Sequence, residues 1–228
     1  MIRPENCPKV TVLICALNEA ECLPQVLPKI PAWVDEILLV DGHSTDSTLE
    51  LALKLRPEVK TLRQPGYGKG DALKYGVQQA SGEIIVTLDA DGQTNPEDIH
   101  MFIKPLLEGY DFAKGSRMIK GRPSSMCRLR YFGNKVLTNS ANLLHGTRYT
   151  DICSGYNAFR KSVFLSLRLT HDSFEMEQEM LVKAKKMGLK VIEVPHQDAG
   201  RLCNASKVSV FKQGFIDLIV IIQERFRD

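Results

Sequence analysis

Two aspartates stand two residues apart where an apolar run ends. The run at 84–88 leads directly into Asp89-Ala90-Asp91-Gly92. Carboxylates this close repel each other, and a hard divalent cation such as Mg²⁺ or Mn²⁺, which takes oxygen ligands and often shares them with phosphates, relieves that repulsion. Such an ion also stabilises charge on a leaving diphosphate. The spacing therefore indicates a metal site for a nucleoside diphosphate, and an ordinary solvated Asp-Gly turn is the alternative.

The segments around these aspartates alternate between strand and helix patterns. Strand-like runs lie at 10–15, 36–40, 58–62 and 84–88, and helical patterns follow Glu21 and Thr45 and lie at 70–80 and 96–107. This alternation predicts an α/β fold with a mainly parallel central sheet and helices on both faces. Ligands of such folds gather beyond the carboxyl ends of the strands, so we expect the loops after Cys15, Val40 and Leu88 to share one rim.

The second half of the chain contains a long basic loop. Strand-like runs at 110–114, 155–160 and 190–194 and helical patterns at 130–144 and 174–187 surround a Gly-, Pro-, Ser- and Arg-rich loop at 115–127. Four arginines lie in or just after this loop, at 117, 122, 128 and 130. Guanidinium groups bind phosphate oxygens through two hydrogen bonds at once, so the loop is a candidate phosphate site. A solvated basic loop is the alternative, which we favour for Arg122 and Arg128.

The C-terminal segment has the pattern of an amphipathic helix. Apolar residues fall on one stripe at 208, 211, 215, 219, 222 and 226. Lys212, Asp217, Glu224 and Arg225 lie away from that stripe. This stripe could lie on a bilayer surface, dock against a membrane partner subunit, or pack back on its own domain.

Composition narrows the class of protein. The 228 residues are 43% hydrophobic and 25% charged, as in soluble globular proteins, and the net charge of +3 is spread along the chain, which argues against a nucleic-acid partner. The six cysteines lack paired spacings, and residues 1–9 lack an apolar signal segment, so we expect reduced thiols in a cytoplasmic protein. The longest apolar run, at 218–222, is far shorter than the roughly 20 residues of a spanning helix.

Several segments together resemble one known family. They are Ala16-Leu17-Asn18-Glu19, Val40-Asp41-Gly42-His43-Ser44-Thr45-Asp46, Gly68-Lys69-Gly70-Asp71, Asp89-Ala90-Asp91, Gly115-Ser116-Arg117, Asp151 with Ser154-Gly155-Tyr156, Glu193-Val194-Pro195, and Arg201 with Ser206-Lys207. In this order they resemble the inverting family 2 glycosyltransferases of the GT-A (Rossmann-like) fold, most closely the polyprenyl-phosphate sugar transferases typified by dolichol-phosphate mannose synthase. The resemblance implies one domain over 1–228, with a donor half at 1–115, an acceptor half at 116–207 and a C-terminal helix at 208–228.

The resemblance implies a donor site for a nucleoside-diphosphate sugar, either GDP-mannose or a UDP-sugar. Its residues are Leu17, Asn18, Glu19, Asp41, Lys69, Asp89, Ala90, Asp91, Arg201 and Lys207. A carboxylate such as Asp41 suits ribose hydroxyls or base N–H groups, whereas residues 44–46 suit the N-cap of the next helix. The family usually has Asp and Gly where Gly42 and His43 stand, so the preferred base stays open.

The resemblance also implies metal, acceptor and catalytic residues. The metal ligands for Mg²⁺ or Mn²⁺ are Asp89, Asp91 and Gln93, the acceptor contacts are Arg117, Arg130 and Asn134, and the catalytic set is Asp89, Asp91, Arg117 and Glu177. Glu177 would act as a base only for a hydroxyl acceptor, because a hydroxyl attacks well only when its proton is removed. A phosphate acceptor is mostly a dianion at neutral pH and is already nucleophilic.

We therefore expect a metal-dependent enzyme that transfers a sugar, with inversion, from a nucleoside-diphosphate sugar to a polyprenyl or dolichyl phosphate. Such an acceptor would bring a cytoplasmic protein to the face of a membrane as a peripheral protein. One alternative keeps the fold and uses a hydroxyl acceptor with Glu177 as base. Another is a nucleotide-sugar binding module without transfer, against which the joint presence of Asp89, Asp91 and Arg201 argues.

Overall fold

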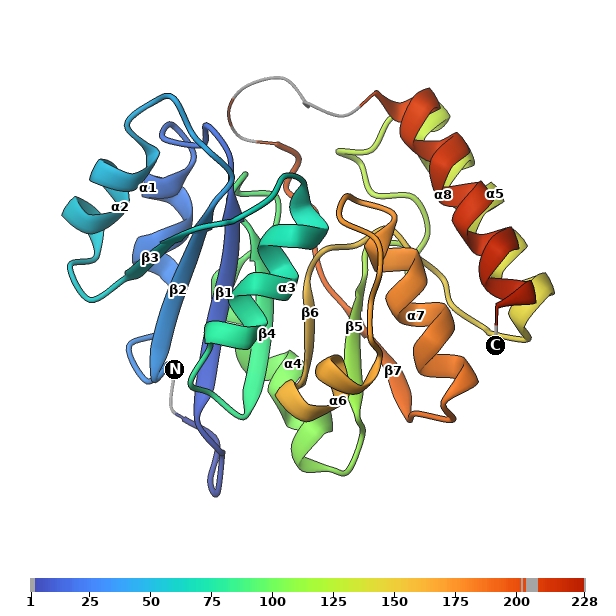
Figure 1. The fold of residues 1–228 in the computed structure, drawn as a ribbon, viewed down its shortest axis with the longest axis horizontal. Coiled ribbons are helices and arrows are strands. Elements are labelled where there is room, and N and C mark those ends of the chain that lie inside the picture. Colours follow the sequence, from blue (N-terminus) through green and yellow to red (C-terminus); the bar gives the residue numbers. More distant parts are fainter. Residues whose placement is uncertain (1–2, 202, 204–208, 228) are drawn as a thin grey trace.

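A seven-stranded sheet runs through the whole computed structural model, which describes residues 3–201, 203 and 209–227 (Figure 1). The strand order is β3-β2-β1-β4-β6-β5-β7, and only β6 runs antiparallel to its neighbours β4 and β5. The strands are β1 Val10–Ala16, β2 Glu36–Asp41, β3 Lys60–Arg63, β4 Ile84–Asp89, β5 Phe112–Ser116, β6 Asn157–Arg160 and β7 Val191–Pro195. The predicted α/β fold with a mainly parallel sheet is confirmed.

Helices cover both faces of the sheet, which explains why the central strands are apolar along their whole length. One face carries α1 Leu23–Val26, η1 Leu27–Lys29, α2 Thr48–Leu55, η2 Pro96–Asp98 and α4 Ile99–Leu107. The other carries α3 Lys69–Gln79, α6 Lys161–Ser166, α7 Met176–Lys186 and, at the end beside β5 and β7, the pair α5 Arg128–His145 and α8 Val210–Phe226. Phe102 of α4 stacks on Tyr156 with ring centroids 3.9 Å apart.

The register of β1 with its two neighbours brings three loops together. Ala16 pairs with Asp41 of β2, and Cys15 pairs with Asp89 of β4. Because all three strands are parallel, their carboxyl ends meet at one edge of the sheet. The loops after β1, β2 and β4 therefore share one rim, as the sequence predicted.

The start of α2 differs from the prediction that residues 44–46 cap it. The helix begins at Thr48, and Asp46 accepts the Thr48 N–H at 3.0 Å, so only Asp46 acts as a cap. The Ser44 hydroxyl oxygen instead accepts the N–H of Asn18 at 2.9 Å, and the Thr45 N–H donates to the Asn18 side chain at 2.7 Å. Ser44 and Thr45 therefore bind Asn18 in the loop after β1 instead of capping α2.

The apolar stripe of α8 faces outward. Phe211, Phe215 and Phe226 are 74%, 66% and 82% exposed, and Ile219 and Ile222 are also exposed. The helix packs against α5 and α7 through its other side, where Val220 and Ile221 are buried. Asp217 and Glu224, which helical periodicity assigned to a polar face, are buried there too. Of the predicted alternatives, packing of the stripe against its own domain is wrong. In the described part of the chain, no helix is long and apolar enough to cross a bilayer.

The prediction of six reduced cysteines is wrong for one pair. Cys22, at the start of α1, and Cys203, between β7 and α8, form a disulfide with Cα atoms 5.7 Å apart. Cys7, Cys15, Cys127 and Cys153 are free thiols. The pair lies 181 residues apart in the chain, so no local spacing announces it. The two sulfurs meet because the segment after β7 crosses the rim to the loop after β1.

Candidate active site

One cavity of about 840 Å³ lies at the carboxyl ends of β1, β2 and β4. At one end its walls include Leu17, Glu19, Gly42, Gln64, Lys69, Asp89, Ala90, Asp91, Gln93 and Arg201. At the other they include Leu129, Phe132, Val136, Phe211, Phe215 and Leu218, from α5 and α8. Arg117, Arg130, Asn134, Glu177 and Asp217 also line it. Residues from near both ends of the chain thus share one space, polar at one end and apolar at the other.

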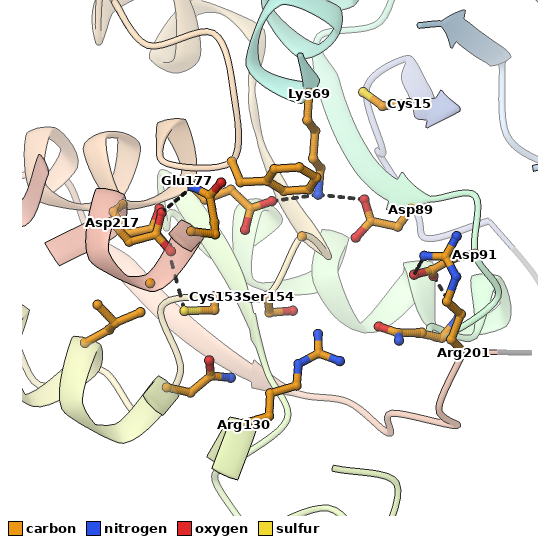
Figure 2. Close-up of a pocket in the computed structure, with 18 of the residues that line it drawn as sticks. Cys15, Lys69, Asp89, Asp91, Arg130, Cys153, Ser154, Glu177, Arg201 and Asp217 are labelled. Atoms are coloured by element: carbon orange, nitrogen blue, oxygen red, sulfur yellow. Dashed lines mark hydrogen bonds and ion pairs between the residues drawn. The ribbon is translucent and has the colours of Figure 1, made fainter. Parts of the chain in front are cut away.

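Both aspartates of the Asp-Ala-Asp segment are paired with cationic side chains. Figure 2 shows Lys69 between two carboxylates, with Nζ 2.6 Å from Asp89 and 2.7 Å from Glu177. Arg201 pairs with Glu19 and places Nη1 3.3 Å from Asp91. Four carboxylates are therefore held by two cations that come from α3 and from the segment after β7.

The protonation of these groups reflects burial and mutual repulsion. Burial, and then the charge of Asp89, raise the pKa of Asp91 to about 6. Burial alone would lower the pKa of Lys69, but the carboxylates of Asp89 and Glu177 outweigh it and raise that pKa above its ordinary value. Lys69 is thus a fixed positive charge, and the aspartate pair is a place where negative charge is costly unless a cation is near.

The aspartate pair fits a divalent cation by its charge and its ligand chemistry. Asp89, Asp91 and the amide oxygen of Gln93 offer the hard oxygen ligands that Mg²⁺ and Mn²⁺ prefer, and all three side chains line the cavity. Within the described residues, no group of three or more His, Cys, Asp and Glu side chains could hold a metal. Oxygens of a bound diphosphate would therefore have to complete the ligand set.

Gly155 lies directly against the ion pair of Lys69 and Asp89. The sequence did not reveal this role. A Cβ at this position would lie 2.5 Å from Asp89 Oδ2 and 2.5 Å from Lys69 Nζ. Any side chain would therefore push the ion pair apart. The segment Ser154-Gly155-Tyr156, noted above only as part of a pattern, lets the backbone before β6 lie against the aspartate.

The residues predicted to bind the donor fall into two groups. Leu17, Glu19, Lys69, Ala90 and Arg201 line the cavity together with the two aspartates. Asn18 and Asp41 do not line it, since both hold the loop after β2: Asn18 accepts the Thr45 N–H, and Asp41 accepts the Ser44 N–H. Lys207 lies outside the described residues. The donor roles of all of these residues stay predictions.

The residues predicted to contact the acceptor lie on the opposite wall. Arg117 is held by a buried, two-point ion pair, with Nε 2.7 Å and Nη2 2.9 Å from the oxygens of Asp151. Its Nη1 makes no hydrogen bond within the described part of the chain. Arg130 and Asn134 extend from α5 into the same cavity. Burial disfavours the charged form of both Arg117 and Asp151. Their mutual attraction outweighs it, raising the pKa of Arg117 and lowering that of Asp151, so both stay ionised.

Asp217 is a carboxyl of the cavity that the sequence did not single out. It lies on α8 near Glu177 (Figure 2), is 6% exposed, and accepts a hydrogen bond from Gln213 Nε2 at 2.8 Å. Burial first, and then the charges of Glu177 and Glu175, raise its pKa to about 7. The helical pattern gave no signal for it, because a polar residue away from an apolar stripe normally faces solvent.

The family of the chain follows from comparison with known proteins. Residues 11–168, more than half of the chain, match the family model described as glycosyl transferase family 2. The chain belongs to glycosyltransferase family 2. This family-2 chain is similar to glycosyltransferase AglJ of Haloferax volcanii, with 38% identity over 82% of this chain and 61% of AglJ. It is also similar to the dolichol-phosphate mannosyltransferase of Pyrococcus furiosus, with 32% identity over 88% of this chain and 59% of that protein.

The family-2 chain therefore spans about three fifths of the length of these two relatives. Its fold is that of the GT-A glycosyltransferases. The glucosyl-3-phosphoglycerate synthase of Mycobacterium tuberculosis, crystallised with Mn²⁺, UDP-glucose and phosphoglyceric acid, superposes with a TM-score of 0.75 at 19% identity, over 97% of this chain and 81% of that protein. The predicted enzyme class, family and fold are confirmed.

Proposed function

We propose that this glycosyltransferase uses Mg²⁺ or Mn²⁺ to transfer a sugar, with inversion, from a GDP- or UDP-sugar to a polyprenyl phosphate at a membrane surface. The observation that carries the proposal is the shape of the cavity. It joins an acidic end, with Asp89 and Asp91, to an apolar end between α5 and α8. A metal diphosphate suits the first, and a hydrocarbon chain suits the second.

The arginines between the two ends support a phosphate acceptor. Arg130 makes no ion pair within the described residues, and Arg117 keeps one guanidinium nitrogen beyond its pair with Asp151. Both line the cavity between the aspartates and the apolar wall. They would hold the acceptor phosphate, while Asn134 would add an amide hydrogen bond. An acceptor of this kind also agrees with the similarity to the dolichol-phosphate mannosyltransferase of Pyrococcus furiosus.

The environment of Glu177 also favours phosphate over a hydroxyl acceptor. Lys69 Nζ lies 2.7 Å from its carboxylate, and the side chain of Glu177 is 9% exposed. The ion pair with Lys69 already engages this carboxylate, whereas a phosphate dianion needs no base. Lys69 would hold Glu177 in place and help to hold the negative charge of the donor. The metal, when bound at Asp89, Asp91 and Gln93, supplies charge stabilisation to the leaving diphosphate.

The outer face of α5 and α8 supports attachment to a membrane surface. Leu129, Phe132 and Val136 of α5 are exposed beside Phe211 and Phe215 of α8, and all five line the mouth of the cavity. Figure 1 shows the two helices side by side at one end of the molecule. Exposed aromatic residues on paired helices suit the boundary between lipid headgroups and acyl chains. A lipid-linked phosphate could then enter the cavity from the bilayer.

The direct test is a transfer assay with matched acceptors. GDP- and UDP-sugars are incubated with Mn²⁺ and either polyprenyl phosphate in vesicles or soluble sugars that offer only hydroxyls. The proposal expects a lipid-linked sugar from at least one donor, and no product when a chelator removes the metal. Transfer to soluble hydroxyls alone would contradict the proposed acceptor, and donor binding without any transfer would favour a binding module.

A further inference from the structure

The side chain of Gln64, just after β3, is buried at the donor end of the cavity. It is 3% exposed, yet it lines the cavity. Its amide nitrogen donates to three oxygens, the carbonyls of Gly66 and Gly68 at 3.0 and 3.1 Å and Asp71 Oδ2 at 3.2 Å. Because an amide oxygen in that place would face only acceptors, these three contacts fix which way the amide points.

The amide oxygen of Gln64 therefore points toward Gly42. A Cβ built on Gly42 would lie 3.2 Å from Gln64 Oε1, and Gly42 itself lines the cavity. No donor contacts this oxygen within the described part of the chain. Because Gln64 lines the cavity, a water molecule or a ligand bound there can donate a hydrogen bond to this oxygen.

The carboxylate that the family resemblance assigns to the nucleoside is engaged elsewhere. Asp41 is fully buried and does not line the cavity. Both of its oxygens lie 3.2 Å from the Ser44 N–H, and Arg63 Nε lies 3.4 Å from Oδ2. Gln64 Oε1 is thus an acceptor that this chain presents where the loops after β1, β2 and β3 meet.

We propose that Gln64 Oε1 reads the base of the donor by accepting the ring N–H of uracil or guanine. Both bases carry a hydrogen on the ring nitrogen of their pairing edge, whereas cytosine and adenine carry a lone pair there, which would face the lone pairs of the amide oxygen. Gly42 leaves the room for a base edge to approach. This inference rests on the proposed donor site and deepens it by naming the group that selects the base.

Titration calorimetry of UDP, GDP, CDP and ADP in the presence of Mn²⁺ tests the assignment. For the wild type we expect UDP or GDP to bind about ten- to a hundredfold more tightly than CDP and ADP, because the wrong base leaves a buried acceptor unpaired. Gln64→Met, which keeps the size of the side chain and removes Oε1, should bring the four dissociation constants to within about threefold of one another.

Two further variants separate base reading from the folding of the loop. Gly42→Ala places a methyl group against Oε1, keeps every hydrogen bond of Nε2, and should also reduce the preference. Asp71→Asn alters the same loop, because Asp71 accepts from both Gln64 and the Gly66 N–H, but it leaves Oε1 in place and should keep the preference.

Three results would overturn the assignment. They are equal affinities of the four nucleotides for the wild type, an unchanged preference in Gln64→Met, and a preference lost in Asp71→Asn but kept in Gly42→Ala. The first two leave the proposed function standing if a nucleotide binds with Mn²⁺. If no nucleoside diphosphate binds the wild type, the donor site fails, and the proposed function fails with it.

Discussion

Lys69 of α3 and Glu177 of α7 form an ion pair of 2.7 Å that joins the donor half of the cavity to the acceptor half. The same Nζ lies 2.6 Å from Asp89, so one lysine neutralises a candidate metal ligand and the candidate base together. Breaking a buried pair by removing one partner leaves a charge without compensation, which is costly. The pair therefore links Glu177 directly to the lysine that also contacts the donor site.

Replacement of Glu177 distinguishes the two acceptor classes. With polyprenyl phosphate as acceptor, we expect Glu177→Gln to lower kcat by less than about tenfold, because a phosphate dianion needs no base. A hydroxyl acceptor would instead lose about a hundredfold or more. Initial rates with each acceptor measure the effect, and donor affinity in the same variant shows whether the site is intact. A severe loss with phosphate would assign a catalytic role to Glu177.

The buried carboxyl of Asp217 predicts a pH dependence of stability. Its pKa is about 7 in the folded protein and about 4 in the unfolded chain. The carboxyl therefore makes its full contribution to the free energy of unfolding below about pH 4. That contribution is lost as the pH rises from about 4 through 7. We expect Asp217→Asn to be about 2 to 4 kcal/mol more stable than the wild type at pH 8, with little difference at pH 4.

Urea unfolding at the two pH values measures this difference. Glu21→Gln, the same charge change at an exposed position, serves as the control and should alter stability by less than about 0.5 kcal/mol. An Asp217→Asn variant that is no more stable than the wild type at pH 8 would show that the carboxyl is ionised without penalty.

The exposed phenylalanines of α8 predict binding to lipid vesicles. Replacing Phe211 and Phe215 by Ser removes two side chains that are 74% and 66% exposed, so the fold should persist. We expect vesicle binding to fall about tenfold or more, and KM for a lipid acceptor to rise, with donor affinity unchanged. Leu53→Ser on α2, also an exposed apolar residue, is the matched control. Equal vesicle sedimentation of the two variants would refute a membrane role for this face.

The disulfide between Cys22 and Cys203 predicts a stability that depends on reductant. A cross-link over 181 residues restricts the unfolded chain strongly, so dithiothreitol should destabilise the wild type by a few kcal/mol and leave Cys203→Ser unaffected. Alkylation of the denatured protein without reductant should modify four of the six cysteines. Modification of all six would mean that the pair is reduced in the isolated protein.

The sequence predicted the features that local patterns encode. Alternating runs placed the strands of the parallel part of the sheet, and the run into Asp89 placed both aspartates at its rim. It did not predict β6 as an antiparallel strand, because the direction of a strand depends on the path of the chain rather than on its residues. The Cys22–Cys203 pair was missed for the same reason. Asp217 was assigned to the wrong surroundings because α8 packs through its less apolar side.

A structure with Mn²⁺ and UDP or GDP bound tests the central claim most directly. We predict an anomalous-scattering peak for manganese between Asp89, Asp91 and Gln93, with an oxygen of the diphosphate as a further ligand of the ion. Lys69 and Arg201 should turn toward the phosphates. A nucleotide bound without a metal at this place, with Asp89 still paired to Lys69 and Asp91 still paired to Arg201, would contradict the account.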